Sequence, residues 1–313
     1  MSILLIHTGG TIGMVQTPSG FSPQTGVVEQ AISDLKHSGA CPRDVDVHLL
    51  TPLIDSANAT PAEWGRIAAL IADHHAQYSG FVVTHGTDTL AYSAAALGFA
   101  LQGLDKPVIV TGAMLPLSVK GSDGMRNLAD AIAAAPSAPA GIWVQFAGQR
   151  LHGVRTRKSH STEFDAFRDT PGTAPPCQPG ETLRVHGFGS AKVAILAMAP
   201  GMPTDLFQHA ARDCDALLLR VYGSGTAPES QGLAMALQIA NRRDIPVLAV
   251  SQCAEGGMAL GTYAAGAILR AHGVIDGRDM TVEAAYAKLH HVLALPVSER
   301  ARLTRPLCGE YSA

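Results

Sequence analysis

Hydrophobic and polar positions along the chain alternate in a pattern that predicts strands followed by helices. Short apolar runs, typical of buried strands, occupy residues 3–8, 47–52, 81–85, 108–112 and 142–146. Segments with helical spacing of apolar residues lie between them, at 27–36, 61–77, 89–102 and 122–135. Thr60, Pro61 and Glu63 form a capping signature at the start of one of these helices. The alternation predicts an α/β fold with a mainly parallel sheet flanked by helices.

The pattern stops between residues 169 and 189, where prolines and glycines accumulate, and then resumes. Strands are expected near 193–198, 217–222 and 247–252. Helices are expected near 204–212, 231–241, 263–272, 282–295 and 298–305. Because Pro- and Gly-rich stretches are typical of interdomain connections, we expect a large N-terminal domain over residues 1–187 and a smaller C-terminal α/β domain over residues 188–313.

Composition narrows the class of protein. With 313 residues, of which 47% are hydrophobic, the chain is long enough to bury two cores. A net charge of −3 without a run of Lys or Arg argues against a nucleic-acid or membrane-surface partner. No apolar segment reaches the roughly 18 residues of a membrane span. The five cysteines are widely spaced and the chain starts without a secretory signal, so we expect a cytoplasmic protein.

Two strand ends carry hydroxyl and carboxylate groups. The strand at 81–85 leads to Thr87 and Asp88, at the point where a helix begins and backbone N–H groups are unpaired. The first strand is followed by two glycines, which allow close approach of a ligand to the backbone, and then by Thr11. Ligands of open parallel sheets bind at the carboxyl ends of the strands. We therefore expect one site formed by the segments around Thr11, Ser56, Thr87 and 112–114.

The segment after Thr11 argues against a phosphate site. Residues 12–23 contain too many glycines and prolines for a helix, and neither glycine-rich nucleotide-binding motif is present there. We interpret this segment as a flap that closes over a small substrate. No cofactor is expected. No metal is expected either, because the paired histidines at 74–75 and 290–291 do not share a helix face and the motif H-E-x-x-H is absent.

The motif T-G-G-T-I-G at 8–13, followed by T-H-G-T-D-T at 84–89, resembles the two signatures of the bacterial-type L-asparaginase family. Segments 51–56, 107–116, 122–128 and 280–284 agree, so the resemblance spans essentially the whole chain, and the C-terminal part is most similar to the cytoplasmic type I branch. It implies an amidohydrolase that converts L-asparagine to L-aspartate and ammonia. It leaves open a minor glutaminase activity, because the two substrates differ by one methylene.

The resemblance also implies roles for individual residues. Thr11 is the implied nucleophile, and Thr87, Asp88 and Lys158 form the second catalytic group. Attack on an amide needs a group that takes and returns a proton, so we expect Lys158 to act as the base, relayed through Thr87. The implied substrate contacts are Asp55, Ser56, Gly86, Thr87, Asp88 and Ala113. Among these, Ser56 and Asp88 hold the substrate's α-carboxylate and α-ammonium.

This chain departs from the family at the flap, where Phe21 occupies the position of a usual tyrosine. A phenyl ring cannot hydrogen-bond Thr11, so either the first step is slower in this chain or another group supplies the contact. We expect Tyr263 to be that group, because its segment in relatives reaches the active site of a neighbouring subunit. A homodimer or homotetramer is implied. Arg220 and Cys253 match a region where some type I relatives bind an effector amino acid, although Arg157 replaces a smaller residue there.

Three other interpretations remain open from the sequence. Thr11 could end a strand, and Thr87 and Asp88 could cap a helix, with no catalytic part. With Phe21 in the flap, the protein could be an amino-acid sensor with little turnover. It could also be the amidase module of a tRNA-dependent amidotransferase. That branch normally carries an extra N-terminal domain, whereas this chain begins at its first predicted strand.

Overall fold

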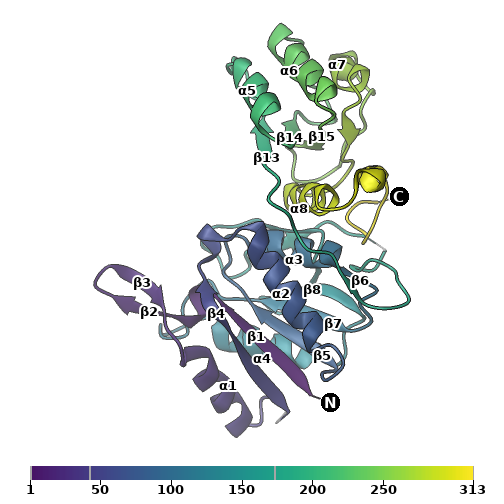
Figure 1. The fold of residues 1–313 in the computed structure, drawn as a ribbon. Coiled ribbons are helices and arrows are strands. Elements are labelled where there is room, and N and C mark those ends of the chain that lie inside the picture. Colours follow the sequence, from purple (N-terminus) through teal and green to yellow (C-terminus); the bar gives the residue numbers. More distant parts are fainter. Residues whose placement is uncertain (1, 42–43, 173, 313) are drawn as a thin grey trace.

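The computed structural model describes residues 2–41, 44–172 and 174–312. The chain folds into two α/β domains (Figure 1). The N-terminal domain contains a six-stranded sheet with the order β4-β1-β5-β7-β8-β9. The five parallel strands are β1 (Ile3–Gly9), β4 (Val45–Ile54), β5 (Gly80–Thr84), β7 (Pro107–Thr111) and β8 (Gly141–Phe146). At one edge, β9 (Gln149–His152) runs antiparallel to β8. The predicted fold class is therefore confirmed.

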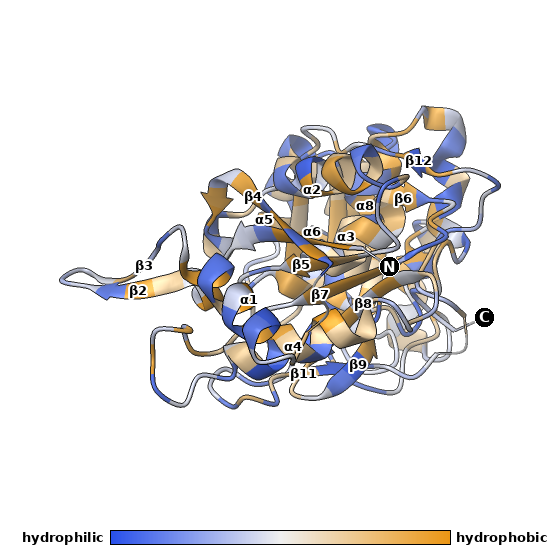
Figure 2. Ribbon diagram, turned by 90° about the horizontal axis from the view of Figure 1, so that it is seen from below, coloured by the Kyte–Doolittle hydropathy of each residue, from blue (hydrophilic) through white to orange (hydrophobic). Residues whose placement is uncertain are grey.

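Successive residues of a strand point to opposite sides of the sheet, and here both sides carry apolar side chains. Helices therefore cover both faces of this sheet. Ile3 and Leu5 of β1 belong to the core under α1 (Val27–His37) and α4 (Gly124–Ala134). Leu4 and Ile6 belong to the core under α2 (Pro61–Asp73) and α3 (Leu90–Ala100). β5 and β7 are buried at every residue, and the ribbon of β7 is coloured mostly as hydrophobic in Figure 2, which explains their continuous hydrophobic runs.

The order of the five parallel strands fixes where a ligand would bind. Counted along the chain, the order is 2-1-3-4-5, so the connection after β1 runs to one side and the connection after β4 crosses back to the other. Crevices of open α/β sheets lie at such a reversal, outside the carboxyl ends of the strands. In this domain the reversal falls between β1 and β5, the strands that precede Thr11 and Thr87.

The C-terminal domain has a four-stranded parallel sheet in the order β13-β14-β15-β16. Its strands are β13 (Val193–Ala197), β14 (Ala216–Val221), β15 (Val247–Ser251) and β16 (Ile275–Asp276). One face packs against α5 (Asp205–Asp213), α6 (Gln231–Arg242) and α7 (Ala267–Ala271). The other face packs against α8 (Val282–Leu293) and the 3-10 helix η4 (Val297–Thr304).

The two domains are joined through α8, which lies between the small sheet and α3 (Figure 1). α3 is buried along almost its whole length, as expected of a helix covered on all sides. Arg155 is fully buried and donates to Asp279 of the C-terminal domain at 2.6 Å. Lys288 of α8 donates to Glu310 at 2.7 Å, and both side chains have no exposed surface. The first ion pair joins the two domains, and the second attaches the C-terminal tail to α8.

Several local features differ from the sequence-based expectation. Residues 12–23 form the 3-10 helix η1 (Thr11–Gly13) and a hairpin of β2 (Met14–Thr17) and β3 (Gly20–Pro23), which extends from the body (Figure 2). The helix expected over 61–77 ends at Asp73, and Lys106 donates to the carbonyl groups of His75 and Tyr78 beyond it. The helix expected over 263–272 is mostly the 3-10 helix η3 (Ala264–Gly266) and the short α7.

Short strands form outside the expected ones. β10 (Thr156–Lys158) pairs with β11 (Phe167–Asp169). The helix expected over 89–102 ends at Ala100, and β6 (Leu101–Gln102) pairs with β12 (Arg184–Val185) of the predicted interdomain connection. These strands have two or three residues, too few for a hydrophobic period to indicate them. None of the described helices is long and apolar enough to cross a membrane.

Candidate active site

Three loops meet at the reversal point of the large sheet, and glycines allow them to touch. A Cβ atom on Gly10 would lie 2.3 Å from the backbone nitrogen of Gly86, and one on Gly86 would lie 2.3 Å from Ser56 Oγ. Gly10 also has a φ of 85°, a conformation that favours glycine. The loops after β1, β4 and β5 are therefore in direct contact, which brings the segments that contain Thr11, Ser56 and Thr87 together.

Buried hydrogen bonds beneath these loops hold β1 and β5 in register. The Thr8 hydroxyl donates to the Thr84 carbonyl at 2.7 Å, and His7 Nδ1 bonds the Thr84 hydroxyl at 2.7 Å. Burial lowers the pKa of His7 from 6.5 to about 4, with a small opposing effect of Glu29, so its imidazole is neutral at physiological pH. Thr11 follows this layer along the chain; it is partly exposed, and its hydroxyl has no hydrogen bond among the described residues.

Lys158 reaches the loop after β5 from a strand of its own. Its Nζ atom donates to Thr87 Oγ1 at 2.9 Å and to Asp88 Oδ1 at 3.1 Å. Thr87 is 6% exposed and the Asp88 side chain is 63% exposed, so the carboxylate faces outward beside a buried hydroxyl. An amine, a hydroxyl and a carboxylate thus form one hydrogen-bonded group, with an open side at which a cationic ligand could pair with Asp88.

Asp55 and Ser56 lie at the end of β4, where the 3-10 helix η2 (Ser56–Asn58) begins. The exposed Asp55 carboxylate caps this helix by accepting from the Ala57 backbone at 3.2 Å and from the Asn58 amide at 2.8 Å. Ser56 is buried, and its carbonyl accepts from the Thr89 hydroxyl at 2.8 Å. Ser56 Oγ lies beside Gly86 of the loop after β5, while the Asp55 carboxylate is bonded to a backbone N–H and a side-chain amide of η2.

Ala113 is buried just after β7, next to the loop that follows β5. The backbone of His85 donates to the Thr111 carbonyl at 2.8 Å, and a Cβ on Gly112 would lie 2.3 Å from the His85 carbonyl oxygen. The structure therefore brings together all the segments that sequence analysis assigned to the site on the N-terminal domain.

Phe21 and Tyr263 are both on the surface. Phe21 lies on β3 and is 46% exposed, while Tyr263 precedes η3 in the C-terminal domain and is 57% exposed. The Tyr263 hydroxyl makes no hydrogen bond within the described part of this chain. Large exposed rings at these two positions are available for contacts outside a single chain.

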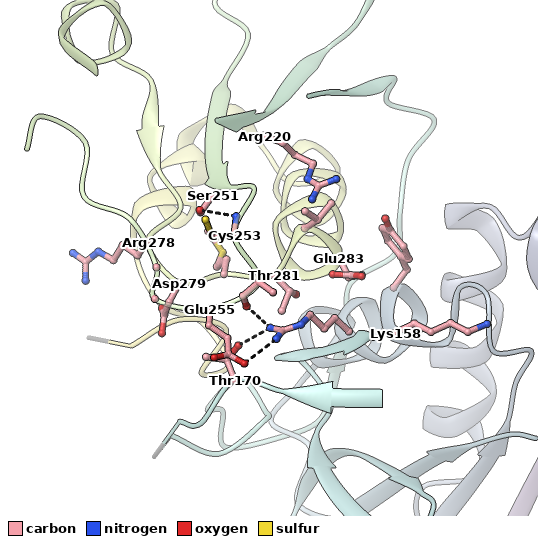
Figure 3. Close-up of a pocket in the computed structure, with 17 residues that line it drawn as sticks. Lys158, Thr170, Arg220, Ser251, Cys253, Glu255, Arg278, Asp279, Thr281 and Glu283 are labelled. Atoms are coloured by element: carbon pink, nitrogen blue, oxygen red, sulfur yellow. Dashed lines mark hydrogen bonds and ion pairs between the residues drawn. The ribbon is translucent and has the colours of Figure 1, made fainter. Parts of the chain in front are cut away.

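A cavity of about 250 Å³ lies between the domains, next to Lys158 (Figure 3). Arg157 and Lys158 of β10 both line this cavity, and the Lys158 amine is bonded to Thr87 and Asp88 at its edge. Arg157 donates to the Ala254 carbonyl and lies 3.6 Å from the Glu255 carboxylate. Glu283 also lines the cavity, and burial raises its pKa, although the nearby Arg157 and Arg220 partly offset this effect.

Sequence reasoning missed the interdomain contact of Arg157 and the glycine contacts between the loops. The Arg157 contact has no local signal, because Ala254 and Glu255 are about one hundred residues away along the chain. The glycine contacts could be predicted only in part, because glycines in the sequence indicate that a backbone approaches closely but not which backbone it is. The described residues contain no cluster of three or more His, Cys, Asp or Glu side chains suited to a metal ion.

Comparison with known proteins places the chain in a protein family. The family model described as "Asparaginase, N-terminal" matches residues 2–186, and the model described as "Glutaminase/Asparaginase C-terminal domain" matches residues 192–303. L-asparaginase 1 of Escherichia coli K12 is 39% identical over 312 residues, covering 94% of this chain and 92% of that protein.

Two further relatives extend the comparison. The crystal structure of L-asparaginase I from Vibrio cholerae superimposes with a TM-score of 0.88 at 34% identity, covering 99% of this chain and 98% of that one. One component of the glutamyl-tRNA(Gln) amidotransferase of Methanopyrus kandleri is 31% identical over 328 residues, covering 93% of this chain and 70% of that protein. From its motifs, its fold and these relatives, the chain belongs to the L-asparaginase family of amidohydrolases.

Proposed function

We propose that this protein hydrolyses the side-chain amide of L-asparagine to L-aspartate and ammonia, with Thr11 as the nucleophile. The observation that carries the proposal is the hydrogen bonding of Lys158 Nζ to Thr87 at 2.9 Å and to Asp88 at 3.1 Å, at the sheet reversal where the Thr11 loop packs against Gly86. The substrate's α-ammonium pairs with Asp88, and its α-carboxylate is held near Ser56.

The Thr11 hydroxyl attacks the amide carbon, and its proton passes through Thr87 to Lys158. Backbone N–H groups of the loops stabilise the negative charge on the amide oxygen. The tetrahedral intermediate collapses, the C–N bond breaks, and the departing nitrogen takes the proton and leaves as ammonia. Water then attacks the Thr11 ester, which releases aspartate and restores the hydroxyl, so the reaction consumes one water per asparagine.

Ammonia release from asparagine tests the proposal in the native protein and in Thr11→Ala, Thr87→Ala and Lys158→Met. Each of these three variants is expected to lose at least about 100-fold in kcat, which is typical for loss of an acid–base or nucleophilic group. Thr304→Ala removes an exposed hydroxyl of η4 and serves as the matched control. Unchanged release by Thr11→Ala removes Thr11 from the mechanism, and aspartate binding without release by the native protein supports the sensor instead.

Further features extend the proposal. A glutaminase activity lower than the asparaginase activity is proposed, because one methylene typically contributes about 1–3 kcal/mol of discrimination. A homodimer or homotetramer, in which Tyr263 approaches the site of a neighbouring subunit, is supported by the 57% exposure of that ring.

A cytoplasmic location agrees with the free thiols at Cys177, Cys214, Cys253 and Cys308. The domain boundary is proposed at residues 187 and 188, within the gap between the two family matches.

A further inference from the structure

The Asp123 carboxylate, at the start of α4, accepts hydrogen bonds from three different residues. It accepts from the backbone nitrogens of Met114 and Leu115, each at 3.0 Å. It also accepts from the side-chain amide of Asn127 at 3.0 Å. Three donors on one partly buried carboxylate form charge-assisted bonds, which are stronger than bonds between neutral groups. The loop that follows β7 is therefore attached to the first turn of α4.

Asn127 extends this attachment to two further strand ends. Its amide nitrogen also donates to the Gly112 carbonyl at 3.0 Å, and its amide oxygen accepts from the Ala147 backbone at 3.1 Å. Asn127 is 1% exposed, so every polar atom of its side chain is buried and used. Gly112 immediately precedes Ala113, one of the residues assigned to the substrate pocket.

The same loop holds the segment that carries Thr11. The backbone nitrogen of Leu117 donates to the Ile12 carbonyl at 3.2 Å, and the Ser118 hydroxyl donates to the Met14 carbonyl at 3.0 Å. Ile12 is fully buried in the core cluster that also contains Ala113 and Leu128 of α4. Hydrogen bonds and packing therefore both connect the start of α4 with the residues that follow Thr11.

Chain connectivity alone does not hold Thr11 in this place. The two residues before it are glycines with positive φ, and the hairpin that follows it extends from the body of the domain. Besides the contact of Gly10 with Gly86, the contacts of Ile12 and Met14 with the loop 114–118 give the Thr11 turn lateral support. That loop in turn depends on the bonds that its backbone donates to Asp123.

We propose that Asp123 is a positioning residue for the Thr11 hydroxyl and acts through the 114–118 loop. The inference deepens the proposed function, on which its kinetic part rests. Without the carboxylate, Met114 and Leu115 lose their acceptor, the loop relaxes, and the Ile12 and Met14 carbonyls move with it. A displacement of about 1 Å at a reacting group costs about 100-fold in rate, so the effect falls on kcat.

The kinetic test compares Asp123→Ala, Asp123→Asn and the control Asp130→Ala. Asp130 lies on the same helix and forms only a partly exposed contact with Arg126 at 3.6 Å. Asp123→Ala is expected to lower kcat for asparagine about 100-fold, with a smaller change in KM. Asp123→Asn keeps one amide oxygen as an acceptor and is expected to restore part of the loss, while the control retains native kcat. Native kcat in Asp123→Ala overturns the proposal.

Hydrogen exchange supplies a readout that is independent of turnover. In Asp123→Ala, the backbone amides of residues 11–17 are expected to exchange faster than in the native protein, while those of β14 in the C-terminal domain stay unchanged. Faster exchange confined to residues 112–119 contradicts the connection to Thr11. If the native protein releases no ammonia, the proposed function fails, but this measurement still decides whether Asp123 supports the Thr11 turn.

Ser118→Ala covers the case in which Asp123→Ala does not fold. This substitution removes only the hydroxyl that bonds Met14 from the outer side of the loop, and the global stability is expected to stay native. A lower kcat with unchanged midpoint of urea unfolding supports the proposal, and Ser118→Thr is expected to restore the rate. Native kcat in Ser118→Ala, with native exchange at residues 11–17, contradicts it.

Discussion

Acidification below pH 6.5 is expected to destabilise the contact between the domains through two adjacent histidines of α8. His290 is 3% exposed and His291 is fully buried, and none of their ring nitrogens has a hydrogen bond in the described part of the chain. His290 packs edge-on against Trp64 and Tyr286, and His291 stacks on Phe99. Burial lowers the pKa of His290 to about 4 and, with help from nearby cations, that of His291 to about 3.

The direction of the effect follows from proton binding. Between the ordinary histidine pKa and the lowered values, the unfolded chain binds protons that the folded protein excludes, so the free energy of unfolding falls as the pH falls. One pKa unit corresponds to about 1.4 kcal/mol, which gives a loss of about 2 kcal/mol per histidine at about pH 5. The pair then costs about 4 kcal/mol, a large share of the roughly 5–15 kcal/mol that stabilises a typical protein.

Urea unfolding at about pH 7.5 and about pH 5 measures this loss, because the free energy of unfolding is obtained at each pH by linear extrapolation. His290→Phe keeps a ring of similar size between Trp64 and Tyr286 and removes one titrating group. The drop between the two pH values is expected to be about 2 kcal/mol smaller in this variant than in the native protein. His209→Gln, at an exposed position on α5, is the control and keeps the native drop. The same drop in His290→Phe as in the native protein refutes the reasoning.

Three further predictions concern the site and the core. Gly86→Ala places a Cβ atom 2.3 Å from Ser56 Oγ, so kcat/KM for asparagine is expected to fall by about 100-fold, whereas native kinetics would show that the loops are not closely packed. Lys288→Met leaves Glu310 buried without its partner and is expected to lower the free energy of unfolding by about 3–5 kcal/mol in urea, with recovery in the double variant that also carries Glu310→Gln. Phe21→Tyr restores the hydroxyl that is usual in the family and is expected to raise kcat by up to about tenfold, the value of one hydrogen bond, in initial-rate measurements. An unchanged rate would mean that another group already contacts Thr11.

The fold class could be predicted because the relevant signals are local. The runs at 3–8 and 81–85 are apolar on both faces, and the structure contains β1 and β5 at these places. Thr60 and Glu63 mark the start of α2 within the sequence itself, and the Glu63 carboxylate accepts from the Thr60 backbone at 2.8 Å. Elements with such signals were found at or near the expected residues.

The hairpin β2–β3 and the strands β10 and β11 could not be predicted in the same way. Their residues are mostly polar or partly exposed, and their strands are four residues long or shorter. Glycine and proline in residues 12–23 indicated turns, but the pairing of Gln16 with Phe21 is a property of the folded hairpin. For such segments, cross-strand contacts decide the structure more than intrinsic preference does.

Some residues of the site could be predicted from local sequence, and others could not. The hydroxyls after β1 and β5 follow from strand ends, because parallel strands in one sheet deliver their carboxyl ends to one edge. Lys158 has no such signal: it lies on a three-residue strand in a basic segment and was singled out by family resemblance alone. Its amine meets Thr87, 71 residues earlier in the chain, only when β10 pairs with β11 beside the sheet.

The amino-acid order by itself thus determined where the long buried strands and helices form, which faces they bury and which hydroxyls lie at the sheet edge, since these depend on neighbours a few residues apart. The tertiary structure alone decided which distant groups meet: Lys158 with Thr87 and Asp88, Arg157 with Ala254, and the Asp123 loop with the carbonyls beside Thr11. The physical reason is that hydrogen bonds and ion pairs form over about 3 Å, and folding sets such distances between remote residues only when the whole core has packed.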